Sequence, residues 1–333
     1  MIFLTEIAIQ SVMGKPLWMW AVFLSLIVIL LAIDLGLFHR KARDIGVAES
    51  LALSAFYIVI ALTFGGWVWH TLGAQAGTEY VTGFLIEKTL ALDNIFVISL
   101  IFSYLAIPPA LQHRVLFWGI VGVIVLRAIM IGLGATLVAE FSWILYIFAL
   151  FLIATGIKML VMTDHAPDIE NNPILRLIRR SMRVTPDLHG ERFLVKQPHP
   201  HTGRNVLWVT PLFVALIMIE IVDLIFAVDS VPAIFAITTD PFIVYTSNIF
   251  AILGLRALYF ALAAVIDRFT YLKPALALVL VFIGSKIFVA DLLGWDKFPA
   301  SISLGVTVSL IAAGIAFSLY RTRRSASVTT AKS

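Results

Sequence analysis

The chain has 333 residues, of which 61% are hydrophobic and only 13% are charged, with a formal net charge of +4. Soluble domains are nearer half apolar and a quarter charged, so this composition excludes a soluble globular protein and leaves no room for a large domain outside a membrane. The sequence contains no cysteine, which excludes disulfides, thiolate metal sites and dithiol redox chemistry within the chain. We therefore expect an all-α, polytopic membrane protein.

Apolar segments long enough to span a membrane recur along the chain. A spanning helix needs about 20 mainly apolar residues. Nine segments reach this length, at 17–38, 48–70, 80–106, 115–138, 141–163, 207–236, 242–266, 273–292 and 298–320. The long polar connection at 164–206 is the main soluble piece, and its stretch from Ile174 to Met182 predicts a short basic amphipathic helix on the membrane surface.

Lysine and arginine are distributed unevenly among the predicted loops. Nine spans place the C-terminal tail on one side of the membrane together with the loops at 39–47, 107–114, 164–206 and 267–273, and these segments carry nearly all the loop Lys and Arg. The opposite side carries Lys15 and Lys297. Because basic loops stay in the cytoplasm, this asymmetry predicts the N-terminus outside and the C-terminus inside.

Short motifs match between two halves of the chain. Three pairs align: Glu87, Asp93 and Asn94 with Asp223, Asp229 and Ser230; Leu126-Arg127-Ala128 with Leu255-Arg256-Ala257; and Gly156-Ile157-Lys158 with Gly284-Ser285-Lys286. Each copy has three spans, an odd number, so the second copy must be inverted in the membrane. The predicted organisation is two N-terminal helices in 1–79, repeat 1 in 80–163, a cytoplasmic loop in 164–206, repeat 2 in 207–293, and a last helix with a cytoplasmic tail in 294–333.

Carboxylates within these apolar segments predict an ion-binding site. Ionisable groups are costly in lipid and mark functional sites, which inverted-repeat transporters place near the middle of the membrane. Carboxylate, amide and hydroxyl oxygens suit Mg²⁺, Ca²⁺ or Mn²⁺ rather than Zn²⁺ or Cu²⁺, without choosing among them. The predicted metal ligands are Glu87, Asp93, Asn94, Glu220, Asp223, Asp229 and Ser230. Asp34, at the inner end of the first span, is weaker evidence, because a residue at that depth can also be interfacial.

The sixth segment cannot aim all its carboxylates at one point if it is a straight helix. Glu220 and Asp223 share one face, but Asp229 lies about 180° from Glu220. Pro232 follows and removes the hydrogen-bond donor for the carbonyl of Val228. We therefore expect a kink or an unwound turn between Asp229 and Pro232.

Basic residues in the same segments allow a purely structural explanation of the carboxylates. Arg127 and Arg256 lie near the middle of their segments and could neutralise Asp93 and Asp229, and Lys88 is a further candidate for charge pairing. Ion pairing therefore remains an alternative to cation binding. The two roles can coexist if a carboxylate exchanges an arginine for a metal ion or for protons.

Several long motifs occur in order and carry a resemblance over roughly residues 17–320. They are Gly83 to Lys88 continuing to Leu92-Asp93-Asn94, then Ile225 to Ile234, Thr239 to Val244, and Ser247 to Arg256. In these stretches the sequence resembles the TerC family of integral membrane proteins, and within it the bacterial Alx-like members. The resemblance implies a multi-pass protein of the bacterial inner membrane, related to LysE-type exporters. It also implies a connection with tellurium resistance, manganese efflux and the response to alkaline conditions.

The leading hypothesis is an exporter of divalent cations, with Mn²⁺ suggested by the family resemblance. The acidic residues that the family implies for this site are Glu87, Asp93, Glu220, Asp223 and Asp229. The sequence contains no nucleotide-binding Gly-x-x-x-x-Gly-Lys-Ser/Thr motif, so we expect an ion gradient, plausibly of protons, to drive export. A LysE-like exporter of an organic solute and a non-transporting scaffold are the alternatives. We expect no enzyme activity, cofactor or nucleic-acid partner.

Overall fold

The computed structural model describes residues 11–38, 47–141, 143–161, 173–198, 204–262, 272–295 and 298–330. Its helices are α2 (Leu17–Phe38), α3 (Val47–Leu72), α4 (Ala74–Tyr104), α5 (Pro109–Glu140), α6 (Ile144–Val161), α7 (Pro173–Ser181), α8 (Pro211–Phe235), α9 (Pro241–Ile252), α10 (Leu255–Leu262), α11 (Leu272–Leu292) and α12 (Ala300–Thr330). Two short hairpins, which we did not predict, are formed by β1 (Ser11–Val12) with β2 (Lys15–Pro16) and by β3 (Leu194–Pro198) with β4 (Asn205–Val209).

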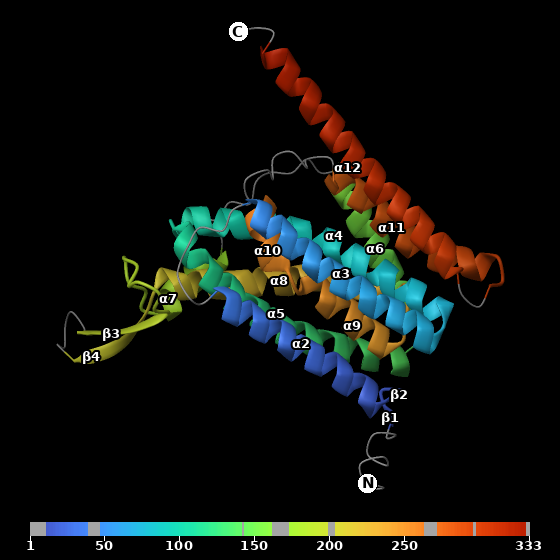
Figure 1. Cartoon of the computed structure of the whole chain (residues 1–333), viewed down its shortest axis with the longest axis horizontal. Helices are drawn as coiled ribbons and strands as arrows, with labels where there is room; N and C mark the ends of the chain where they lie inside the picture. Colours follow the sequence, from blue (N-terminus) through green and yellow to red (C-terminus); the bar gives the residue numbers. More distant parts are fainter. Residues whose placement is uncertain are drawn as a thin grey trace.

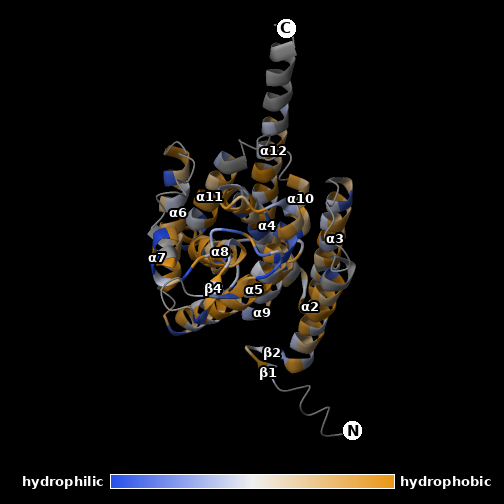
Figure 2. Cartoon of the chain, turned by 90° about the vertical axis from the view of Figure 1, so that its left-hand side faces the viewer, coloured by the Kyte–Doolittle hydropathy of each residue, from blue (hydrophilic) through white to orange (hydrophobic). Residues whose placement is uncertain are grey.

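The long helices form one bundle, beyond which α12 extends (Figure 1). Eight candidate spans within the described ranges are long and apolar enough to cross a membrane, with α9 and α10 together forming one of them. Hydrophobic residues run along the outer helices α2 and α3 (Figure 2). The chain is therefore an all-helical, multi-pass membrane protein. The remaining expected segment, the third in chain order at 80–106, corresponds to α4. This segment is helical but is not among the eight candidate spans.

Helix α4 lies inside the bundle, where it packs against α3, α8, α9 and α12. Four charged residues lower its hydropathy: Glu79, Glu87, Lys88 and Asp93. Tyr80 and Ile95, near the two ends of this charged stretch, are fully buried. Neighbouring helices thus shield α4, and a helix with this many charges need not face lipid.

Of the kink or unwound turn expected between Asp229 and Pro232, the unwound turn is wrong, because α8 remains helical through Pro232. The interruption lies in the seventh segment, where α9 ends at Ile252 and α10 begins two residues after Leu253. Gly254 joins them with a φ of 78°, and a Cβ there would lie 2.8 Å from the Tyr57 side chain. A residue other than glycine would thus be both strained and crowded at this break.

Helices α6 and α11 approach closely at two glycines. A Cβ on Gly156 would lie 2.7 Å from the carbonyl oxygen of Ala277, and one on Gly284 would lie 2.5 Å from the carbonyl oxygen of Ala149. The two contacts are reciprocal, since both partners shift by the same 128 residues, from 156 to 284 and from 149 to 277. The glycine motifs matched in the sequence therefore contact each other's helices, α6 and α11.

The polar connection forms a small layer at one end of the bundle, where α7 and the β3–β4 hairpin lie together (Figure 1). The amphipathic helix expected at Ile174 to Met182 is present as α7. Its Leu175 and Ile178 are buried in the same apolar cluster as Leu212 at the start of α8. The apolar face of α7 therefore packs on the bundle.

Candidate functional site

Arg127 on α5 is at the centre of a polar cluster between four helices, and its side chain is 2% exposed. Its guanidinium forms a fork with Asp223 on α8, with Nε donating to Oδ2 at 3.1 Å and Nη2 to Oδ1 at 3.0 Å. Nη1 pairs with Glu87 on α4 and donates to Ser230 Oγ at 2.9 Å and to Asn248 Oδ1 at 3.4 Å. Such charge-assisted, two-pronged contacts fix the orientation of the guanidinium as well as its position.

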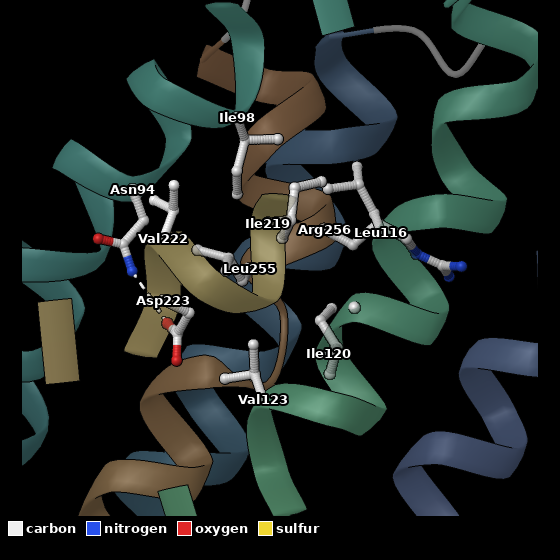
Figure 3. Close-up of a pocket in the computed structure, with 11 residues that line it drawn as sticks. Asn94, Ile98, Leu116, Ile120, Val123, Ile219, Val222, Asp223, Leu255 and Arg256 are labelled. Atoms are coloured by element: carbon white, nitrogen blue, oxygen red, sulfur yellow. Dashed lines mark hydrogen bonds between the residues drawn. The ribbon is translucent and has the colours of Figure 1, made fainter. Parts of the chain in front are cut away.

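Two amide side chains complete this network. Asn94 Nδ2 donates to Asp223 Oδ1 at 3.2 Å, a contact shown in Figure 3, and Asn248 Nδ2 donates to Glu87 Oε2 at 3.0 Å. Both carboxylates thus accept from the arginine and from an asparagine. We refer to the six residues as the central cluster: Glu87, Asn94, Arg127, Asp223, Ser230 and Asn248.

The central cluster contains more negative than positive charge. Arg127 is shared by Glu87 and Asp223, which leaves one carboxylate charge in excess when all three groups are ionised. A buried charge without compensation is costly, so such an excess favours an additional cation or a proton. The positions of the Asp93 and Asp229 side chains lie outside the described part of the structure.

Glu220 lies on α8 one turn before Asp223, and its carboxylate packs against the backbone of Gly122 on α5, where a Cβ would overlap it. Glu220 Oε2 and Asn94 Oδ1 are buried acceptors without a hydrogen-bond partner among the described residues. Buried acceptors are nearly always satisfied in folded proteins. Glu220 precedes Asp223 by one helical turn, and Asn94 is hydrogen-bonded to Asp223. Two unsatisfied acceptors on these neighbours of Asp223 indicate a place for a proton donor or a cation.

A cavity of about 20 Å³ adjoins the central cluster. Asn94, Asp223 and Arg256 are its polar lining residues, and apolar side chains such as Ile98, Ile120 and Ile219 supply much of the remainder (Figure 3). This volume holds about one water molecule. The cavity therefore fits a small ion and, in this conformation, excludes an organic solute.

Arg256, the sequence equivalent of Arg127, has different partners. Its guanidinium pairs with the Asp34 carboxylate and donates to the Asp34 carbonyl at 3.3 Å, and Tyr57 Oη donates to Asp34 Oδ1 at 3.2 Å. Figure 3 shows the head group of Arg256 directed away from Asp223. Asp34 is therefore a buried partner of an arginine.

The described charge partners differ from those expected from the sequence. We expected Arg127 and Arg256 to neutralise Asp93 and Asp229, whereas Glu87, Asp223 and Asp34 are the partners that the structure describes. Lys88 donates from Nζ to the carbonyl oxygens of Ala251 at 3.1 Å and Leu253 at 3.4 Å, at the break between α9 and α10. These carbonyls end a helix and lack the usual intrahelical donors.

Sequence reasoning missed Asn248 as a member of the site. It is fully buried and bonds both to Arg127 and to Glu87. An asparagine within an apolar segment is a usable signal, and Asn248 falls inside one of the motifs noted above. Among the residues that the structure describes, no three His, Asp or Glu side chains are grouped as metal ligands. Arg127 pairs with both Glu87 and Asp223.

Comparison with known proteins matches the chain to membrane proteins over most of its length. The model of the integral membrane protein TerC family matches residues 72–326 of the chain. An uncharacterized membrane protein of Rickettsia felis is 50% identical over 302 residues, which cover 91% of this chain and 97% of the relative. One from Myxococcus xanthus is 46% identical over 310 residues, covering 93% of this chain and 94% of the relative.

A third relative has a functional name. The "putative membrane-bound redox modulator Alx" of Photorhabdus laumondii is 46% identical over 308 residues, which cover 90% of this chain and 93% of the relative. No solved structure matches the chain. The matches extend over both halves of the chain and include every residue of the central cluster, because all of these lie within residues 72–326.

Proposed function

Because the chain belongs to the TerC family of integral membrane proteins, we propose that it exports divalent cations through the central cluster. The observation that carries this proposal is the shared use of one buried arginine by Glu87 and Asp223. Two carboxylates from different helices converge on one cation inside the bundle, and a divalent metal ion in place of the guanidinium would neutralise both of them.

Arg127 fills the site in this conformation. A metal ion that binds both Glu87 and Asp223 must therefore displace at least part of the guanidinium, and the two cations compete for the same oxygens. Such competition makes the occupancy of the site depend on conformation, as a ligand shifts an equilibrium only through different affinities for its states. Glu220 Oε2 and Asn94 Oδ1 supply further oxygen ligands or proton acceptors beside the same carboxylates.

Two inverted repeats, with α4 as a ninth span, complete the proposed transporter. The reciprocal contacts of Gly156 and Gly284 support a two-fold relation between the halves, because such an axis pairs each contact with its equivalent. The central cluster joins α4 and α5 to α8 and α9, where a repeat interface would lie. Rocking of one repeat against the other would expose the site alternately, with the N-terminus outside and the C-terminus in the cytoplasm.

The oxygen ligands favour a hard metal ion, and the family resemblance favours Mn²⁺ among these. The small cavity beside Asp223 argues against the organic solute of a LysE-like exporter. A redox role like the one in the name of the Photorhabdus relative would, in this chain, require chemistry other than that of its own thiols, because the chain contains no cysteine. Exchange of the metal for inward-moving protons on the same carboxylates would supply the driving force.

The test measures cell-associated metals by elemental mass spectrometry in a manganese-sensitive bacterium that lacks its exporters. Wild type is compared with Glu87→Gln and Asp223→Asn at equal membrane expression, and Glu140→Gln, an exposed carboxylate on α5, is the matched control. We expect wild type and the control to lower cellular Mn and both cluster variants to fail. Unchanged Mn in cells with wild type would overturn the exporter proposal.

A further inference from the structure

Two cavities lie at the end of α8 that is remote from β4. One has a volume of about 270 Å³ and is bounded by α4, α6, the end of α8, and α11. The other has a volume of about 410 Å³ and lies beneath the β1–β2 hairpin. Glu79, Thr238 and Thr239 belong to the walls of both cavities, so the two adjoin. We refer to them together as the end vestibule.

Most charged groups of the end vestibule have partners of their own. Lys15 Nζ pairs with Asp240 Oδ2 at 2.7 Å, and Tyr146 donates its hydroxyl hydrogen to Asp291. These contacts account for both cationic and anionic groups around the rim. Besides Lys15, Asp240 and Asp291, the walls contain one further carboxylate and one ammonium, which form no close ion pair among the described residues.

Those two groups are Glu79 and Lys286, which are 6% and 5% exposed. Both line the 270 Å³ cavity. Glu79 Oε1 accepts a hydrogen bond from Gln75 Nε2 at 3.0 Å, and Lys286 Nζ donates to Ser303 Oγ at 3.2 Å. Each therefore has a neutral hydrogen-bond partner, and the opposite charges of Glu79 and Lys286 also interact electrostatically. This interaction compensates part of the cost of burying the two charges, and a cation that binds Glu79 would compete with it.

The end vestibule and the central cluster are connected by two helices, α4 and α8. Glu79 precedes Glu87 by eight residues on α4, which corresponds to about 12 Å along the helix. Helix α8 makes the same connection, since it contains Asp223 and ends at Phe235 in the vestibule wall. A cation released from the central cluster towards this end would therefore meet Glu79.

We propose that Glu79 is a second, low-affinity binding site for a divalent cation in the end vestibule, and that Lys286 keeps this site weak enough for the cation to leave. Conduction requires binding that is favourable enough for entry and weak enough for departure. A carboxylate attracts the metal ion, and an ammonium in the same cavity limits its residence. This inference rests on the proposed export function for its direction, but the charge preference of the vestibule can be measured without transport.

The natural absence of cysteine allows that measurement. Thr239→Cys places a single thiol on the wall of both cavities. Its labelling rate is measured with two methanethiosulfonate reagents of similar size, one carrying an ammonium group and the other a sulfonate group. The ratio of the two rates reports the charge preference of the vestibule. We expect the cationic reagent to react faster. Glu79→Gln should lower the cation-to-anion rate ratio about ten-fold and Lys286→Gln should raise it about ten-fold, since one charge a few ångströms away changes each rate about three-fold in water.

Leu292→Cys is the labelling control, because this residue is 87% exposed at the end of α11 and lines neither cavity. Its rate ratio should stay constant in both backgrounds. Mn²⁺ should slow the cationic labelling of Thr239→Cys when Glu79 is present and not in Glu79→Gln. Equal ratios in Thr239→Cys alone, in Thr239→Cys with Glu79→Gln and in Thr239→Cys with Lys286→Gln would overturn the vestibule site.

Transport separates this inference from the exporter proposal. In manganese-loaded cells, Lys286→Gln should slow efflux by about ten-fold at saturating Mn²⁺ while lowering the concentration for half-maximal rate, as tighter binding delays release. Efflux by Glu79→Gln that equals wild type at every concentration would overturn the vestibule inference and leave the exporter proposal standing. Absence of efflux in wild type, together with the expected labelling ratios, would overturn the exporter proposal and retain a cation site.

Discussion

Arg127 and Arg256 occupy matching positions in the two sequence motifs but pair with carboxylates on different helices. Arg127 joins carboxylates on α4 and α8, and every one of its hydrogen-bond partners lies in the motif-bearing helices. Arg256 pairs with Asp34 on α2, outside either motif copy. The same residue thus holds together a potential binding site in one half and attaches a flanking helix in the other. Sequence equivalence therefore does not imply equivalent function here.

The largest effect should follow from removing the shared arginine. Arg127→Met leaves Glu87 and Asp223 facing each other without a cation, and breaking a buried ion pair costs about 3–5 kcal/mol. We expect a marked fall in the thermal unfolding temperature of the purified protein, and partial recovery when Mn²⁺ replaces the missing charge. Mn²⁺ should stabilise wild type less, because Arg127 already occupies the site.

The matched control for that change is Arg114→Met on the same helix. Arg114 pairs with Glu191 at 2.8 Å, but the two side chains are 30% and 51% exposed. Exposed pairs contribute about 0–1 kcal/mol, so this variant should unfold near the wild-type temperature. A variant Arg127→Met that is as stable as wild type, with no greater response to Mn²⁺, would contradict the assignment of Arg127 as the built-in cation.

An intermediate effect should follow from the other arginine. Arg256→Met leaves Asp34 without its guanidinium and should lower stability by about 3 kcal/mol, at the lower end for a buried pair because the Asp34 side chain is 11% exposed. Unlike Arg127→Met, this variant should gain no additional stability from Mn²⁺ and should retain export per folded molecule. Thermal unfolding with and without Mn²⁺, normalised to membrane expression, distinguishes the two arginines.

The smallest effect should come from crowding Glu220. Gly122→Ala places a methyl group where the Glu220 carboxylate packs. Overpacking costs about 1–3 kcal/mol, and we expect the lower end here, because the carboxylate is the end of a flexible side chain and can move aside. We expect export to fall more than stability, since the displaced group is part of the site. Gly66→Ala on α3 is the control, because a Cβ there meets nothing within 4 Å. Equal export by the two alanine variants would argue against a role for Glu220.

Local properties of the sequence were sufficient for much of the fold. Segment length and hydropathy identified the membrane helices, and the basic amphipathic pattern identified α7. The predicted turn at Pro232 failed because proline within a membrane helix need not unwind it when neighbouring helices support the backbone. The break at Gly254 gave no comparable signal, since glycine is also common within continuous membrane helices.

The sequence predicted most residues of the candidate site but not the contacts between them. Glu87 and Asp223 were proposed together, and the structure brings both to Arg127. Which carboxylate an arginine meets depends on how the helices are placed around it, and periodicity along one helix does not contain that information. Asn248 and the end vestibule depend on contacts between segments more than 150 residues apart, such as Asn248 with Glu87.

The break at Gly254 separates two arms of one membrane segment that are held in different ways. Two consecutive residues of α4 bind α9 and its C-terminal end. Glu87 accepts a hydrogen bond from Asn248, and Lys88 donates to the carbonyl oxygens of Ala251 and Leu253. Helix α10 is tethered to α2 through Arg256. Gly254 could therefore act as a hinge at which α10 rotates relative to α9. The ion pair between Arg256 and Asp34 on α2 would limit the size of that rotation.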